Sequence, residues 1–190
     1  MLNYSDLKKG IIIIYKNQPC EIIEASAMFK ARGHSTLQVK LKNLITGNII
    51  SEKFRPSDNF EEAEIKKKEI KFIYNNKDQF VFSEKDNPSK RFSFKESQLG
   101  PIVKLLKPNQ IIQGLVFNNK IVNISLPIKI SLRVSQAPPG IKGDRAQGGN
   151  KIVVLETGAE MSVPLFIKEG DIIEINTDKQ EYVRRLKKND

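Results

Sequence analysis

The chain has 190 residues, 39% hydrophobic and 28% charged, and contains a single cysteine, Cys20. The single cysteine excludes an internal disulfide. No apolar run reaches the roughly 20 residues that span a bilayer, and a signal peptide pattern is absent. We therefore expect a cytoplasmic protein without membrane contacts. The net charge of +10 favours an anionic partner such as nucleic acid, although a solvated lysine-rich surface would also account for it.

Runs of β-branched and aromatic residues recur about every 8–12 positions, which predicts small β-barrels or sandwiches rather than an α/β fold. Four hairpins are expected, with strands at 11–15 and 20–24, 37–44 and 48–54, 111–117 and 120–126, and 172–175 and 181–185. Only residues 96–106 suggest a helix, which Pro101 limits to a short element.

Three units are predicted from the turn-rich stretch 56–62 and from the Leu126-Pro127 junction. They are 1–64 (9 basic and 8 acidic residues), 65–127 (12 and 5) and 128–190 (11 and 9), so the central unit has a net charge of +7. A faint repeat at 7–12, 106–112 and 167–173 places paired isoleucines after a turn with Gly or Pro. Two interpretations explain the repeat: three small barrels each use a similar corner, or this sequence pattern occurs at any β corner.

A cationic finger is predicted around residues 28–42. Leu37, Val39 and Leu41 should share one strand face, with Gln38, Lys40 and Lys42 on the other. Because no acidic residue lies between Glu24 and Glu52, we expect no internal counter-charge on the basic side chains, which are Lys30, Arg32, Lys40, Lys42 and His34. This hairpin either reaches into RNA or is simply solvated, and the lone His34 predicts a surface position and no metal site.

Two further segments are candidates for RNA contact. Segment 136–151 contains Gly140, Gly143, Gly148 and Gly149, which allow close backbone approach to a phosphate or base; it could equally be a flexible connector. The tail 182–188 combines one tyrosine with several cations, a composition that also serves solubility.

Six aromatic residues occur in pairs two positions apart, so each pair is expected on one strand face. If exposed they would form a base-stacking platform, but core packing is the preferred interpretation. The six residues are Phe72, Tyr74, Phe80, Phe82, Phe92 and Phe94. No catalytic, metal or dinucleotide-binding pattern occurs, so we expect no enzyme activity, cofactor or metal.

Four segments in order resemble the bacterial elongation factor P family over nearly the whole chain. Residues 151–170 are similar to its signature of Lys, Gly, Val-Pro and a final Gly, and the other matches are 39–47, 143–149 and 181–185. The resemblance implies an all-β protein with a KOW/SH3-like barrel (1–64) followed by two OB-fold barrels (65–127 and 128–190).

The resemblance also implies a function. Such a protein would bind the 70S ribosome between the P and E sites, contact rRNA, P-site peptidyl-tRNA and E-site mRNA, and relieve stalling at consecutive prolines. It would position the tRNA without reacting, as a monomer. The alternatives are an elongation factor P-like paralogue and a general single-stranded nucleic-acid-binding OB-fold protein.

Counting back eleven positions from Asn43 places Arg32 at the tip of the finger, near the peptidyl-transferase centre, between Lys30, Ala31, Gly33 and His34. This setting fully matches neither Pro-Gly-Lys-Gly nor Ser-Gly-Arg-Asn, the family's modified tips, so a tip-modifying enzyme as partner is left open. The residues expected to bind RNA are Lys40, Lys42, Gly143, Asp144, Arg145, Ala146, Gly148, Gly149, Tyr182, Arg184 and Arg185.

Overall fold

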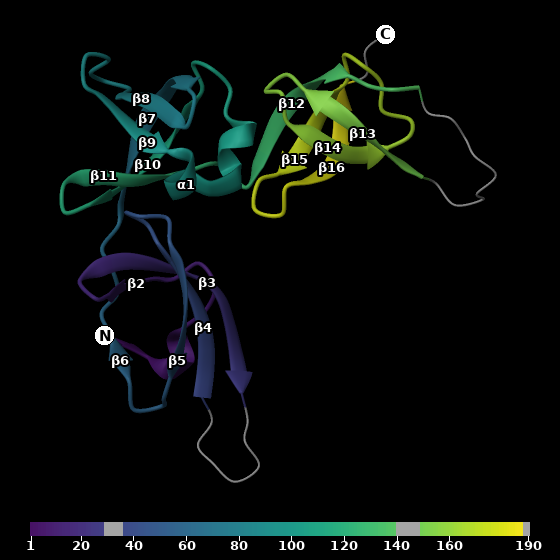
Figure 1. The fold of residues 1–190 in the computed structure, drawn as a ribbon. Helices are drawn as coiled ribbons and strands as arrows, with labels where there is room; N and C mark the ends of the chain where they lie inside the picture. The colour runs from purple at the N-terminus through teal and green to yellow at the C-terminus, as the bar shows by residue number, and fades with distance from the viewer. Residues whose placement is uncertain (29–35, 140–148, 188–190) are drawn as a thin grey trace.

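A computed structural model describes residues 1–28, 36–139 and 149–187. They form an all-β fold built on three antiparallel sheets, with one short α-helix (Figure 1). The first sheet has four strands in chain order, β2(Ile12–Tyr15), β3(Gln18–Met28), β4(Thr36–Asn43) and β5(Ile49–Phe54). Beside it, β1(Leu2–Asn3) pairs with β6(Asn59–Phe60), and η1(Tyr4–Asp6) follows β1.

The second and third sheets share one strand order, in which the first strand is central and pairs with the second and the fourth. The second sheet consists of β7(Lys66–Asn76), β8(Gln79–Glu84), β9(Arg91–Lys95), β10(Ile111–Phe117) and β11(Lys120–Ser125), with α1(Glu96–Leu99) and η2(Gly100–Leu105) after β9. The third consists of β12(Lys129–Gln136), β13(Asn150–Leu155), β14(Glu160–Pro164), β15(Ile172–Asn176) and β16(Glu181–Lys187).

The two five-stranded sheets correspond residue by residue at their central strands. The main-chain N–H of Phe72 donates to Gln110 O, and that of Val134 donates to Asp171 O, each at 2.9 Å. In each sheet the register shifts directly after this residue, so that a β-bulge follows at the same position. Phe72 and Val134 are therefore equivalent, and their neighbours can be compared directly.

The predicted repeat is one recurring corner. Main-chain hydrogen bonds from Ile11, Gln110 and Asp171 to the carbonyl three residues earlier close three turns. The third turn residue has a positive φ in each copy, at Gly10, Asn109 and Gly170. The sequence pattern thus marks a shared structural element, placed just before β2, β10 and β15.

All four predicted hairpins are confirmed, as is the short helical region. The β10–β11 turn is Asn118-Asn119, both with positive φ, as a two-residue hairpin turn requires. Five of the six aromatic residues lie in or against the core that joins the second and third sheets. The expectation that Phe72 and Tyr74 share a face is wrong, because the bulge between them turns Tyr74 outward, where it is 47% exposed.

The junction between the first and second sheets combines apolar packing with specific hydrogen bonds. Leu44 packs against Leu115 and Val122 in a small core of its own. Gln98 Nε2 donates to Ile45 O at 2.5 Å, and a Cβ on Gly47 would come within 2.2 Å of the carbonyl oxygen of Ser97. These contacts fix the angle at which the first sheet extends from the rest (Figure 1).

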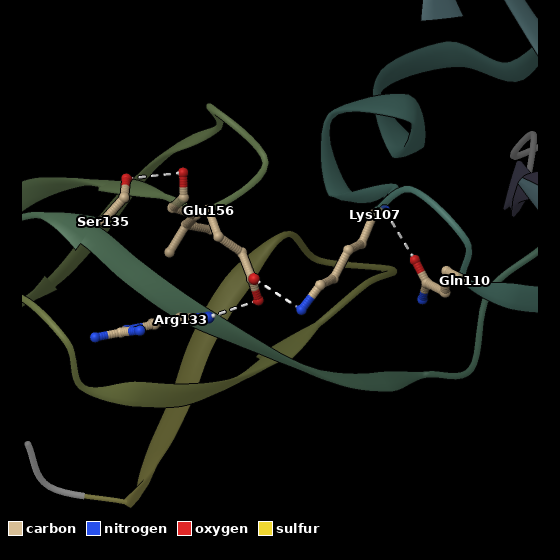
Figure 2. Close-up of polar contacts among 6 residues, drawn as sticks. Lys107, Gln110, Arg133, Ser135 and Glu156 are labelled. Atoms are coloured by element: carbon tan, nitrogen blue, oxygen red, sulfur yellow. Dashed lines mark hydrogen bonds and ion pairs between the residues drawn. The ribbon is translucent and has the colours of Figure 1, made fainter. Parts of the chain in front are cut away.

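The junction between the second and third sheets combines a continuous apolar core with an ion pair. Figure 2 shows Lys107, from the corner before β10, reaching across to Glu156, with Nζ 2.7 Å from Oε2. The other carboxylate oxygen of Glu156 accepts the main-chain N–H of Arg133 at 3.1 Å. Burial works against ionisation of Glu156, but the hydrogen bonds from Lys107 and Arg133 outweigh it and lower the pKa of this carboxyl.

Candidate RNA-binding surfaces

The predicted cationic finger belongs to the β3–β4 hairpin, which forms an arm that extends away from the second and third sheets (Figure 1). Its strands are paired from Cys20 and Asn43 out to Met28 and Thr36. Leu37, Val39 and Leu41 are buried on one face, as their alternation predicted. The predicted tip residues Lys30, Ala31, Arg32, Gly33 and His34 join the two outer strand ends but lie outside the described residues.

Lys40 has an acidic partner on the arm, contrary to expectation. A register shift between Ile22 and Glu24 places Glu24 directly opposite Lys40, and Lys40 Nζ lies 2.6 Å from Glu24 Oε2. Sequence counting treated Glu24 as the limit of the acid-free stretch, whereas strand pairing brings it back onto the arm. Both side chains are about half exposed, so Lys40 remains accessible to a phosphate.

Lys42 lies at the junction with the second sheet rather than on the free part of the arm. Its Nζ donates to the carbonyl oxygen of Leu99 at 3.3 Å. Burial lowers the pKa of this ammonium, and the neighbouring Glu21 partly opposes the shift. Its geometry assigns it to the junction, while RNA binding by Lys42 stays a prediction.

The glycine-rich segment connects the first two strands of the third sheet. Gly143, Asp144, Arg145, Ala146 and Gly148 lie outside the described residues. At the described margin, the main-chain N–H of Leu165 donates to Gly149 O at 3.3 Å, and Lys151 Nζ donates to Pro138 O at 2.7 Å. These two bonds secure the base of the loop on either side.

The basic strand β16 is tied to the third sheet through its arginines. Arg184 Nη2 lies 3.2 Å from Glu174 Oε2, and Arg185 Nη1 lies 3.4 Å from Asp171 Oδ2. The guanidinium of Arg185 also stands 5.1 Å from the ring centre of Phe166. Burial opposes the charge on Glu174, yet hydrogen bonds from Arg184 and Lys129 hold its pKa below the usual value.

Tyr182 packs partly against the core, so only part of this side chain is accessible for stacking on RNA. Arg184 is the most accessible cation of the predicted trio, with 65% of its side chain exposed. Sequence reasoning placed these three residues on one strand correctly but missed their carboxylate partners, which β15 and its preceding turn supply.

Within the described ranges, neither a metal-holding cluster nor a membrane-spanning helix is found. No group of three or more His, Cys, Asp or Glu side chains there has metal-holding geometry. None of the described helices is long and apolar enough to cross a membrane. An open groove of about 640 Å³ between the first and second sheets is lined by Glu61, Glu62, Glu64 and Lys66, so its net charge is negative and does not favour RNA.

Comparison with known proteins gives consistent matches along the chain. Residues 3–60 match the family described as "Elongation factor P (EF-P) KOW-like domain", and residues 130–185 match "Elongation factor P, C-terminal". A protein from Moorella thermoacetica named elongation factor P is 35% identical over 185 residues, covering 97% of this chain and all of that protein. One from Desulfotalea psychrophila is 34% identical over 187 residues, covering 98% of this chain and all of that protein.

Among solved structures, eukaryotic translation initiation factor 5A from Methanococcus jannaschii aligns with 66% of this chain and 90% of its own. The sequence identity is 13% and the TM-score 0.46. The full-length sequence relatives carry the assignment, since this structural likeness is too low to add to it.

Proposed function

The chain belongs to the elongation factor P family of non-enzymatic translation factors, and on that premise we propose a specific role for it on the ribosome. It binds between the P and E sites beside peptidyl-tRNA and stimulates peptide-bond formation where ribosomes stall at consecutive prolines. The observation that supports this most is the 35% identity over 97% of the chain, with family matches near both ends.

The proposed division of labour follows three units, 1–64, 65–127 and 128–190. The arm of the first unit carries the tip segment, and Arg32 orders the terminal nucleotides of the P-site tRNA. The glycine-rich segment lies beside E-site mRNA. Ordering a poorly oriented substrate lowers the entropic part of the barrier, and this requires no bond chemistry by the protein.

The fold supports such a role because it holds the arm rigidly. Positional catalysis fails if the positioning group moves, and misplacement by about 1 Å can cost roughly a hundredfold in rate. The junction bonds from Gln98 to Ile45 and from Lys42 to Leu99 tie the base of the arm to the second sheet.

The test is synthesis of a Pro-Pro-Pro reporter on purified ribosomes with and without the protein. We expect stimulation on the proline stretch and none on a matched alanine stretch. Binding to ribosomes with P-site tRNA should weaken steeply with salt. Binding to free single-stranded oligonucleotides as tight as to ribosomes would instead identify a general nucleic-acid-binding protein.

A further inference from the structure

The outward face of β7, β8 and β9 forms a surface that the proposed function does not use. The strand register places its side chains in three rows across the sheet. These rows are Lys71–Ser83–Arg91, Tyr74–Val81–Ser93 and Asn76–Gln79–Lys95; Ser83 is buried between its neighbours, and the other eight are partly or fully exposed. The opposite face supplies Phe72, Phe82 and Phe94 to the core.

Tyr74 is the aromatic side chain of this outward face and stands near its middle. The bulge after Phe72 reverses the alternation of β7, so that Tyr74 pairs with Val81 instead of entering the core. The ring is 47% exposed, next to the half-buried Val81 and the exposed Ser93. An exposed ring above a flat sheet can stack with a nucleobase.

The charges on the same face are all positive. Lys71 and Arg91 lie two strand spacings apart, about 10 Å, with Tyr74 roughly 7 Å further along β7. None of the nine residues is acidic, and within the described ranges Lys71, Arg91 and Lys95 form no ion pair. The nearest acid along β7, Glu69, is held by Lys85 at 2.8 Å. Free cations around an exposed ring complement a polyanion that also offers aromatic faces.

The third sheet provides an internal comparison. From the equivalence of Phe72 and Val134, the position of Tyr74 is occupied by Gln136. By the same register, Arg133 stands where the second sheet has Lys71, Glu156 where it has Ser83, and Glu160 where it has Ser93. The third sheet thus keeps one cation, but it has two carboxylates and no aromatic ring at the corresponding positions. A shared fold alone does not produce the surface around Tyr74.

We propose that this face binds a single-stranded segment of ribosomal RNA, with a base stacked on Tyr74 and phosphates paired with Lys71 and Arg91. The first three strands of an OB fold offer a surface of suitable size, since such folds hold about 4–16 nucleotides. RNA is favoured over a protein partner because the face combines unpaired cations with a single ring and has little contiguous apolar area. The site is independent of the tip segment and does not rest on its activity.

The first test measures binding of a fluorescently labelled uridine RNA of about ten nucleotides by anisotropy at low salt. Stacking contributes enough that Tyr74→Ala should raise the Kd at least about fivefold, while Tyr74→Phe should stay within about twofold. Ser93→Glu, which copies the third sheet, should weaken binding by a similar factor. Ser57→Glu adds the same charge at an exposed turn of the first unit and serves as the matched control.

The second measurement is the salt dependence. Lys71→Ala with Arg91→Ala removes two phosphate contacts and should reduce the slope of log K against log salt by about 1.4. Lys104→Ala with Lys120→Ala removes the same charge from exposed positions of this unit off the face and should change the slope less. Equal effects of the two double variants, with no effect of Tyr74→Ala, would overturn the proposal in favour of diffuse attraction.

The third measurement places the site on the ribosome. A photoreactive phenylalanine analogue at position 74 should cross-link to ribosomal RNA in the bound complex. Cross-links to a ribosomal protein, together with RNA binding that ignores Tyr74→Ala, would show a protein-docking face instead. Because the oligonucleotide assay needs no active ribosome, its failure is separable from failure of proline-stretch synthesis.

Discussion

The side-chain amide of Asn123 on β11 donates a hydrogen bond of 2.9 Å to the main-chain carbonyl of Leu44, 79 residues earlier in the chain. Asn123 is buried, and its own oxygen accepts the N–H of Ile124. The amide is thus satisfied on both sides while it joins two sheets. A buried carbonyl that loses such a donor has no water to replace it.

Asn123→Ala should therefore destabilise the protein by about 1–3 kcal/mol, because the Leu44 carbonyl is left unpaired at the junction. Chemical denaturation measures this loss. Asn87→Ala, at an exposed position of the same unit, should change stability by less than about 0.5 kcal/mol. Equal stability of the two variants would show that the bond contributes nothing at the junction.

Gly47 and Gly158 form a matched pair for testing close packing at the same junction. Both have positive φ, 79° and 83°, so alanine strains both backbones by about 1–2 kcal/mol. A Cβ on Gly47 would also collide with the Ser97 carbonyl, whereas one on Gly158 meets nothing within 4 Å. We expect Gly47→Ala to cost roughly 1–3 kcal/mol more than Gly158→Ala in thermal or chemical unfolding.

Arg32→Ala should abolish most stimulation of Pro-Pro synthesis while leaving stability and ribosome affinity nearly unchanged. A guanidinium offers a planar fork of donors that can hold a phosphate or base edge in two places, so Arg32→Lys should recover little. Lys30→Ala should do less harm. The assay measures Pro-Pro synthesis with each variant at saturating concentration. If Lys30→Ala gave no stimulation and Arg32→Ala stimulated normally, Lys30 rather than Arg32 would occupy the tip.

Replacing both Gly148 and Gly149 with valine should weaken rescue of stalled ribosomes with the fold intact. Branched side chains prevent the close backbone approach to RNA that the segment is proposed to make. A Cβ on Gly149 would sit 3.5 Å from Leu165, an ordinary contact, so packing alone gives no reason for unfolding there. Circular dichroism checks the fold, and unchanged rescue would leave the segment as a connector.

Acid should destabilise the protein through Glu84, Glu156 and Glu174, whose pKa values are lowered in the folded state. Their contribution is fully present above the unfolded glutamate value of about 4.3, and it is lost as pH falls through the lower folded values. Glu21 acts in the opposite direction, because burial raises its pKa. Glu174→Gln should flatten the decline in melting temperature between about pH 5 and pH 3, and an unchanged decline would contradict this assignment.

Local signals in the sequence predicted the hairpins well. Asn118-Asn119 predicts a two-residue turn from these two residues alone. The recurring corner could be recognised in the sequence because its geometry depends on four adjacent residues. The errors lie where a bulge alters pairing between distant strands. Alternation could not reveal that Tyr74 faces outward or that Glu24 stands opposite Lys40.

The candidate site residues were predicted mainly from the family resemblance. The positions of these residues in the fold were predicted only in part. Charge patterning identified the arm, but it did not show that the ammonium of Lys42 donates to the carbonyl oxygen of Leu99 at the end of α1. A contact between residues that are 57 positions apart in the chain cannot be predicted from local sequence periodicity. The partners of Arg184 and Arg185 were missed for the same reason, since they come from β15 and the turn before it.

The bulge after Phe72 recurs after Val134, so it is a feature of the strand pairing that both five-stranded sheets share. Because the bulge turns this position outward in both sheets, Tyr74 and Gln136 differ there in side chain alone. The surface chemistry at this position can therefore be changed by substitution without any insertion or change in strand pairing. Deleting Ile73 would reverse the parity of β7 and turn the tyrosine toward the core.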